Sequence, residues 1–189
     1  MLGPMKTRTT LISAALAAFA LLAPSAASAQ DTTGSSYVKE THGAWQIRCL
    51  KRSDGQERCQ MYQQLKDSNG TPTAEINIFA VPADVPAAAG AAFVTPLMTL
   101  LQAQLRFQVD SQQGKRYPFA WCDESGCIVR AGITADEIEA MKKGSSATVG
   151  IVAVSAPTTP VNLKMSLSGF TAAYTAMQAL NPPLPPAKQ

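Results

Sequence analysis

Hydrophobic and polar residues alternate in several short runs of this sequence, which is the pattern of a β-strand with one buried face. In the clearest run, Trp45, Ile47 and Cys49 alternate with Gln46 and Arg48. Such runs and their turn-bounded neighbours predict strands at residues 45–49, 59–65, 74–81, 105–110, 116–122, 127–131, 147–154 and 161–167. Short strands with a turn about every 8–12 residues predict a mainly β fold with the architecture of an antiparallel β-sandwich.

A short helix is predicted after residue 134. Thr134 and Glu137 fit a capping box, and Gly144 stands where a helix C-cap is expected. Ile138 and Met141 alone form its apolar stripe, which is typical of a short surface helix.

A second helix is predicted over residues 170–179. Phe170, Tyr174 and Met177 lie on one face of it, at positions i, i+4 and i+7. The Pro-rich run at residues 181–186 ends this helix and indicates an extended tail.

The stretch after the third predicted strand gives conflicting signals. Pro82 and Pro86 interrupt regular structure, so residues 81–92 are predicted to form a loop. For residues 93–101 a strand and a helix both remain open, because residues 97–105 also satisfy a helical spacing.

The N-terminus has the features of a signal peptide. Lys6 and Arg8 supply a positive region, residues 11–22 form an apolar run, and small residues precede a cleavage site between Ala29 and Gln30. A membrane anchor is the alternative, but 12 residues of helix span only about 18 Å of a hydrocarbon core of about 30 Å. We therefore expect an exported protein, located in the periplasm, associated with the outer membrane or secreted, with no transmembrane segment in its mature chain.

These signals divide the chain into four predicted parts: a signal peptide (residues 1–29, starting at Met1 or Met5), a flexible lead-in (30–36), a β-sandwich domain (37–180) and a Pro-rich tail (181–189). The 160 residues left after cleavage (189 minus 29) suffice for one domain with a real core. Their charge is nearly balanced, because two of the 16 basic residues leave with the signal peptide and 14 remain against 13 acidic ones. Nucleic acid is therefore not expected as a partner, since it needs a clustered basic face.

The four cysteines predict two disulfides, because an even number in an exported chain is typical of a disulfide framework. Three pairings are possible, and the local one is favoured. A turn at residues 53–55 would bring Cys49 beside Cys59, and a second turn would bring Cys122 beside Cys127. The alternatives are a zinc site or a redox dithiol. The spacing of four residues would just fit zinc, but the spacing of nine would not, and neither fits a redox dithiol.

No catalytic, cofactor-binding or metal-binding residues are predicted, and we do not expect an enzyme. The one histidine, His42, precedes a strand without a nucleophile in a recognisable setting. Adjacent acidic residues have structural explanations as turn or helix-start residues: Asp123, Glu124, Asp136, Glu137 and Glu139. Phosphate-binding glycine motifs are absent from the sequence.

Two smaller features complete the candidate chemistry. Arg106, Lys115 and Arg116 predict a modest basic spot. Trp45 and Trp121 each stand near a cysteine and are predicted to pack against the disulfides in the core.

Three segments in the right order resemble motifs of the invasion-associated locus B family of Gram-negative envelope proteins. They are residues 42–49 with 59–61, residues 118–119 with Cys122 and 126–127, and residues 166–173. The resemblance covers about residues 37–180 and departs from the family pattern at Ala44 and at residues 85–92. It implies an immunoglobulin-like sandwich in the periplasm or at the outer surface, with local disulfides and without known catalytic residues.

Three functions follow as hypotheses. The first is a non-catalytic binding module whose loops, at residues 81–93 or 123–126, contact a protein of the envelope or host surface. The second is a virulence-associated invasion or adhesion factor at the outer surface, as the family name implies. The third is an unrecognised hydrolase, which requires a polar cleft containing His42 or paired acids.

Overall fold

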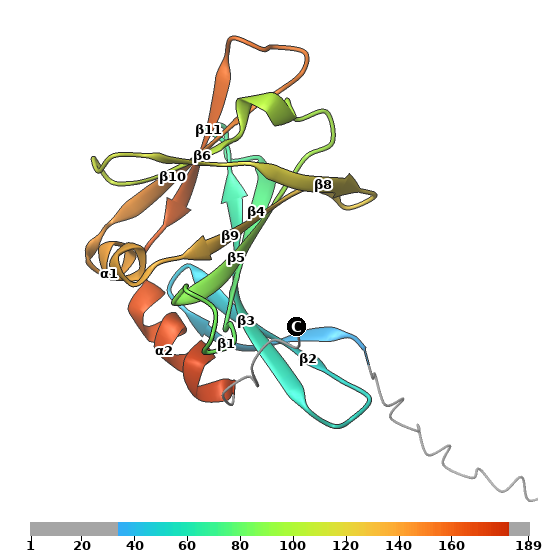
Figure 1. Cartoon of the computed structure of the whole chain (residues 1–189), viewed down its shortest axis with the longest axis vertical. Coiled ribbons are helices and arrows are strands. Elements are labelled where there is room, and N and C mark those ends of the chain that lie inside the picture. Colours follow the sequence, from blue (N-terminus) through green and yellow to red (C-terminus); the bar gives the residue numbers. More distant parts are fainter. Residues whose placement is uncertain (1–33, 182–189) are drawn as a thin grey trace, which may run out of the picture. The chain divides into compact units, whose positions relative to one another are not determined.

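The computed structural model of the chain describes residues 34–181 (Figure 1). The predicted signal peptide, its cleavage site at Ala29 and Gln30, and the tail from residue 182 onward lie outside the described residues. The predicted lead-in is described only from Gly34, and Ser36 already begins the first strand. No helix in this part of the chain is long and apolar enough to cross a membrane.

Residues 34–181 contain eleven strands, two α-helices and one 3-10 helix. In chain order these are β1 Ser36–His42, β2 Trp45–Lys51, β3 Glu57–Lys66, β4 Pro72–Phe79, β5 Ala89–Thr95, η1 Leu101–Ala103, β6 Leu105–Val109, β7 Lys115–Tyr117, β8 Phe119–Asp123, β9 Gly126–Ile133, α1 Ala135–Lys143, β10 Ser146–Val152, β11 Pro160–Ser166 and α2 Phe170–Leu180. The predicted antiparallel, mainly β fold with two short helices is confirmed.

All eleven strands belong to one antiparallel hydrogen-bonded network. Its main path runs β7-β6-β10-β11-β3-β4-β5-β9-β8, and β1 and β2 branch from it at β3. The network folds over itself, so that Phe93 of β5 meets Phe107 of β6 across the core with their ring centroids 6.0 Å apart. The two layers are joined along β3, where Lys66 pairs with Lys164 of β11.

The core follows from the alternation seen in the sequence. In β2 Trp45, Ile47 and Cys49 are fully buried, while Gln46 and Arg48 between them are half-buried. The same period places Leu163 and Met165 of β11 inside. In most strands every second side chain faces one continuous apolar cluster, so hydrophobic burial stabilises the network.

The two predicted helices are both present. The capping box of α1 forms as expected, with Thr134 Oγ1 accepting from Glu137 N and the Glu137 carboxylate accepting from Thr134 N. In α2 the predicted face of Phe170, Tyr174 and Met177 is buried.

Three strand predictions were incomplete. Residues 116–122 were predicted as one strand, but the chain divides at Pro118 into β7, which pairs with β6, and β8, which pairs with β9. Residues 81–92 were predicted to form a loop, but β5 starts at Ala89 and pairs with both β4 and β9 through backbone hydrogen bonds, which an alanine-rich segment forms as any other does. The sequence also gave no indication of β1, whose side chains are mostly exposed, so no buried face appears as alternation. The undecided stretch 93–101 completes β5 and then turns into η1.

Two glycines bring the start and the end of the domain together. Gly43, between β1 and β2, and Gly169, before α2, both adopt positive φ angles, 57° and 82°. A Cβ on Gly169 would lie 2.1 Å from the carbonyl oxygen of His42, and one on Gly43 would lie 2.6 Å from that of Ser168. The backbones therefore touch directly, and Ala44 N donates to Ser168 O over 3.0 Å.

Both local disulfides are present. Cys49 and Cys59 face each other across β2 and β3, and Cys122 pairs with Cys127 across β8 and β9. No cysteine of the described residues is free.

The two tryptophans have opposite environments. Trp45 is buried as predicted, against Phe170 of α2, and its indole Nε1 donates to Ser166 O. The prediction for Trp121 was wrong, because β8 lies at the end of the sheet path and leaves this side chain 45% exposed.

Candidate functional site

Four exposed hydrophobic side chains form what we call the apolar tip: Leu97, Met98, Leu101 and Val154. Their exposed fractions are 55%, 70%, 38% and 44%, and they are four of the nine large hydrophobic side chains exposed in the described residues. The two segments are adjacent, because Val154 N donates to Met98 O over 2.8 Å and Thr99 forms a β-bridge with Ala153. A contiguous exposed apolar group of this kind is typical of an interaction surface.

The loop before η1 is held in a specific conformation. Met98 in this loop and Gln104 directly after η1 both adopt positive φ angles, 66° and 57°, which are uncommon for residues other than glycine. Two buried hydroxyl groups secure the loop, because Thr99 Oγ1 donates to Pro96 O over 2.7 Å and lies 3.2 Å from Thr95 Oγ1. The exposure of Met98 is therefore built into an anchored turn.

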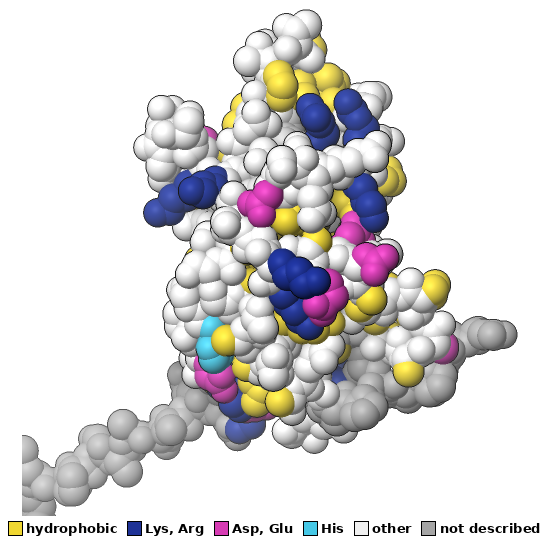
Figure 2. Space-filling model, turned by 90° about the vertical axis from the view of Figure 1, so that its left-hand side faces the viewer, with side chains coloured by type: hydrophobic (Ala, Val, Ile, Leu, Met, Phe, Trp, Pro, Cys, Tyr) yellow, Lys and Arg dark blue, Asp and Glu magenta, His cyan; other side chains and the backbone are white. Residues whose placement is uncertain are grey.

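The charged side chains nearest to the apolar tip are basic. Residues 85–105 and 144–163 contain no charged side chain. The first charges behind the tip are Arg106 and Arg116, which pair directly across β6 and β7, and Arg116 Nη1 donates to Ala103 O. The upper end of the domain, formed by η1 and the β10–β11 loop, accordingly carries hydrophobic and basic side chains together (Figures 1 and 2).

The predicted basic spot is thus only partly formed. Arg106 and Arg116 lie together beside a small hollow of about 150 Å³ below the tip. Lys115 points elsewhere, because its Nζ forms an ion pair of 2.8 Å with Glu137 of α1.

A second candidate is a crevice of about 550 Å³ between β2, β3 and β11, which we call the cationic crevice. It is lined by Ala44, Gln46, Arg48, Tyr62, Gln63, Gln64, Lys66, Asp67, Lys164 and Ser166. Two strands pair with the same edge of β3, one after the other. β2 pairs with it as far as Tyr62, β11 pairs with it only at Lys66, and the crevice lies between them.

A side-chain amide forms the floor of the crevice where strand pairing is missing. Gln63 is buried; its Oε1 accepts from Ser166 N over 2.7 Å and its Nε2 donates to Ser166 O over 2.8 Å. Trp45 Nε1 donates to the same carbonyl oxygen over 3.0 Å. These bonds satisfy the buried polar groups and fix β11 at a distance from β2.

Basic side chains occupy both ends of the crevice. Arg48 lies with its guanidinium carbon 3.2 Å from the centroid of the Tyr62 ring, and its Nε donates to Gln46. Lys66 and Lys164 lie directly opposite each other at the other end. No ion pair found among residues 34–181 involves either lysine.

The only carboxylate lining the crevice among the described residues, Asp67, is engaged in the following turn. Its Oδ1 accepts from Asn69 N and Thr71 N, each over 2.9 Å. Burial raises the pKa of the Tyr62 hydroxyl, with the nearby Glu75 carboxylate contributing in the same direction. The crevice is therefore net positive and polar.

The residues that a hydrolase would require are not assembled. His42 Nε2 lies 2.8 Å from Glu40 Oε2 on β1, and neither residue lines the crevice. Asp123 closes its own turn, where hydrogen bonds from Ser125 hold the pKa of its carboxyl below the usual range. The paired acids that the sequence offers thus serve turns and helix ends.

Glu137 is the acidic side chain with the most partners. Burial by itself would raise the pKa of Glu137, but hydrogen bonds from Lys115, Thr134 and Tyr117 outweigh it and hold this pKa below the ordinary value. Burial and the same carboxylate raise the pKa of Tyr117. The arrangement joins α1 to β7.

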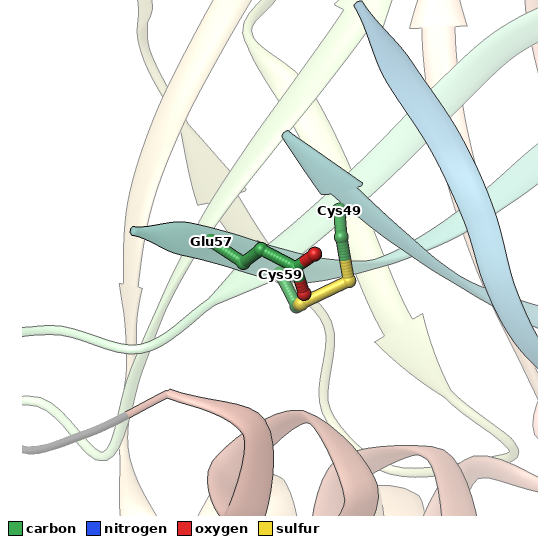
Figure 3. Close-up of side chains that lie close together, drawn as sticks. All are labelled: Cys49, Glu57 and Cys59. Atoms are coloured by element: carbon green, nitrogen blue, oxygen red, sulfur yellow. A yellow bond between two sulfur atoms is a disulfide. The ribbon is translucent and has the colours of Figure 1, made fainter. Parts of the chain in front are cut away.

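One group with metal-ligand side chains occurs in the described residues: Cys49, Glu57 and Cys59 (Figure 3). The two sulfur atoms are bonded to each other, so thiolate ligands are not available. Glu57 in turn accepts from Tyr37 and forms an ion pair of 2.9 Å with Lys39. The group therefore consists of a disulfide that links β2 to β3 and a carboxylate beside it.

The loops predicted as contact surfaces have different positions from the apolar tip. Residues 81–88 remain a loop, and the turn at 123–126 is exposed beside Pro96, but neither contributes a residue to the tip. A run of 21 uncharged residues, 85–105, was the available sequence signal for the tip. No local signal marked the crevice, because its basic residues come from three separate strands.

Comparison with known proteins gives consistent relatives. The sequence matches the family described as invasion associated locus B (IalB) protein over residues 45–178. Invasion protein B homologues of Brucella abortus, from strain 2308 and from biovar 1 strain 9-941, are each 29% identical over 164 residues, which is 85% of this chain and 91% of theirs.

The fold agrees with this relationship. The crystal structure of invasion associated protein B from Bartonella henselae matches with a TM-score of 0.62 and 25% identity, over 75% of this chain and 95% of the other. The motifs at residues 42–49 and 166–173 are those that Gly43 and Gly169 bring into contact. With the sequence match and the fold in agreement, this chain belongs to the invasion associated locus B family.

Proposed function

We propose that the protein is an exported, non-catalytic binding protein of the cell envelope that contacts its partner through the apolar tip. The observation that carries this proposal is the exposure of Leu97, Met98, Leu101 and Val154 on anchored turns. A soluble domain gains nothing in stability from a Met side chain that is 70% exposed, so a contact that buries it is the natural explanation.

Export is supported by two kinds of observation. The N-terminal segment has the features of a signal peptide with cleavage after Ala29. Two disulfides are typical of proteins that fold in an oxidising compartment such as the periplasm. The absence of a catalytic role is supported by the structural use of His42 and the acidic turn residues.

Site-specific photo-cross-linking in intact cells tests the tip. A photoreactive residue at position 97 is expected to give discrete adducts, whereas one at Ser53, exposed in the β2–β3 turn, is expected to give none of them. The double variant Leu97→Glu/Met98→Glu should abolish partner capture by chemical cross-linking while leaving the melting temperature within a few degrees, because both side chains are exposed. Identical adducts from positions 97 and 53 would show that the tip is not the contact surface.

A second candidate is an invasion or adhesion factor that acts at the outer surface. It is favoured by the names of the relatives, which are called invasion proteins. Protease treatment of intact cells separates the two candidates, because a surface protein is digested and a periplasmic one is protected. Entry into cultured host cells by a deletion strain, complemented with the wild type or the tip variant, then tests the role directly.

A further inference from the structure

The cationic crevice has features that the fold alone does not require. Like charges directly opposite each other in neighbouring strands destabilise a sheet. Lys66 and Lys164 nevertheless form the one residue pair that joins β3 to β11, without a carboxylate in ion-pair distance among the described residues. An anion placed between the two ammonium groups would remove this repulsion.

The crevice is also preorganised for binding. Gln63 and Trp45 hold Ser166 with three hydrogen bonds, so the floor does not have to rearrange. Arg48 lies over the Tyr62 ring and donates a hydrogen bond to Gln46. Because its side chain is already ordered, binding a ligand there costs less conformational entropy. The volume of about 550 Å³ is within the range of about 300–1,000 Å³ common for small-molecule sites.

The spacing of the basic side chains determines where the ligand carries its negative charges. Arg48 lies over Tyr62, and the lysine pair lies four residues further along β3, which corresponds to about 13 Å at 3.3 Å per residue. A single small anion does not bridge these two ends. A ligand that uses both carries an anionic group near each end.

The walls between the cations select the body of the ligand. Gln46, Gln64 and Ser166 supply side-chain groups that both donate and accept hydrogen bonds. Ala44 is the only aliphatic side chain among the lining residues. Such a surface suits the hydroxyl groups of a sugar better than the side chains and backbone of a peptide.

We propose that the cationic crevice binds an acidic oligosaccharide, with oxyanion groups at Arg48 and at the Lys66–Lys164 pair and sugar hydroxyls at the amides between them. The anionic groups are carboxylates or phosphates, which share the same charge-assisted hydrogen bonding. This inference concerns a surface other than the apolar tip, so it does not depend on the proposed function.

Binding measured by calorimetry on the mature, disulfide-bonded protein tests the proposal with defined probes. Trigalacturonate, a carboxylated trisaccharide, or maltotriose carrying a phosphate at each end is expected to bind at least tenfold more tightly than neutral maltotriose. Whichever of the two binds more tightly identifies the anionic group. Triglutamate binding as tightly as both acidic sugars would overturn the saccharide assignment, and failure of both sugars to bind would overturn the site.

Variants locate the binding. Lys66→Gln and Lys164→Gln are each expected to weaken acidic-sugar binding at least fivefold, while Lys143→Gln on the exposed surface of α1 should leave it within twofold. Because the two lysines repel each other, either substitution should leave the melting temperature unchanged or raise it, which separates a ligand-binding role from a structural one. Equal affinities for all three variants would overturn the proposal.

Discussion

At the residue scale, burial distinguishes side chains that look equivalent in the sequence. Trp45 and Trp121 both stand close to a disulfide, yet Trp45 is fully buried and Trp121 is 45% exposed. Trp45 also contributes to two features, because it packs edge-on against Phe170 and donates a hydrogen bond to Ser166 at the floor of the cationic crevice.

The two tryptophans therefore predict opposite responses to the same substitution. Trp45→Phe removes core volume and leaves the Ser166 carbonyl short of one donor, so it should lower the free energy of unfolding by about 2–3 kcal/mol. Trp121→Phe should change it by less than about 0.5 kcal/mol. Urea denaturation of both variants checks this, and a larger loss for Trp121→Phe would contradict the assigned burial.

At the scale of elements, the start of α1 shows how one side chain serves several contacts. Glu137 completes the capping box with Thr134 and also accepts from Tyr117 and Lys115 of β7. These hydrogen bonds favour the ionised carboxylate and lower its pKa in the folded protein, against the effect of burial. The helix is thereby fastened to the short strand that ends the main path of the sheet.

This contact predicts a stability difference that depends on pH. Because the folded pKa of Glu137 lies below its ordinary value of 4.5, its contribution is present above about pH 4.5 and is lost as the pH falls through the lowered value. Glu137→Gln should therefore be less stable than the wild type at pH 7, and the difference should shrink by pH 3. Urea denaturation at the two pH values measures it, with Glu124→Gln in an exposed turn as the control; a difference that stays constant would contradict the assignment.

At the scale of the whole domain, its first and last segments meet at two glycines. The turn after β1 and the turn before α2 are 126 positions apart between Gly43 and Gly169 (169 minus 43), and their backbones are in contact. Trp45 and Phe170, the residues that begin β2 and α2, pack against each other beside this contact. Two of the three sequence motifs that carry the family likeness thus form one structural unit.

Substitution of these glycines should reveal that contact. Gly169→Ala requires a Cβ 2.1 Å from the His42 carbonyl oxygen, so the two turns must separate. Gly55→Ala is the matched control, because Gly55 has a similar φ of 78° but nothing within 4 Å of its Cβ position. We expect the control to cost about 1 kcal/mol from backbone strain alone and Gly169→Ala to cost at least twice as much. Thermal unfolding of both variants decides, and equal losses would mean that the turns are not packed as described.

The sequence by itself determined the elements of this protein and little of its surface. Alternation and turn signals located nine of the eleven described strands, with β7 and β8 predicted as one. The capping box located α1, and the cysteine spacing favoured the two disulfides that the structure contains, because each of these features depends on residues close together in the chain. The strand β1 and the start of β5 were not predicted, because an exposed edge strand and an alanine-rich strand show no alternation of hydrophobic and polar residues.

The tertiary structure decided which residues meet across long separations. The apolar tip joins two loops about 55 residues apart, and the cationic crevice exists only because β3 changes partner between Tyr62 and Lys66. Strand pairing depends on how the whole network folds over its core, and one sequence does not encode it in any local window. The candidate sites of this protein therefore depend on its topology, whereas the strands and helices that hold them follow from the local pattern of the sequence.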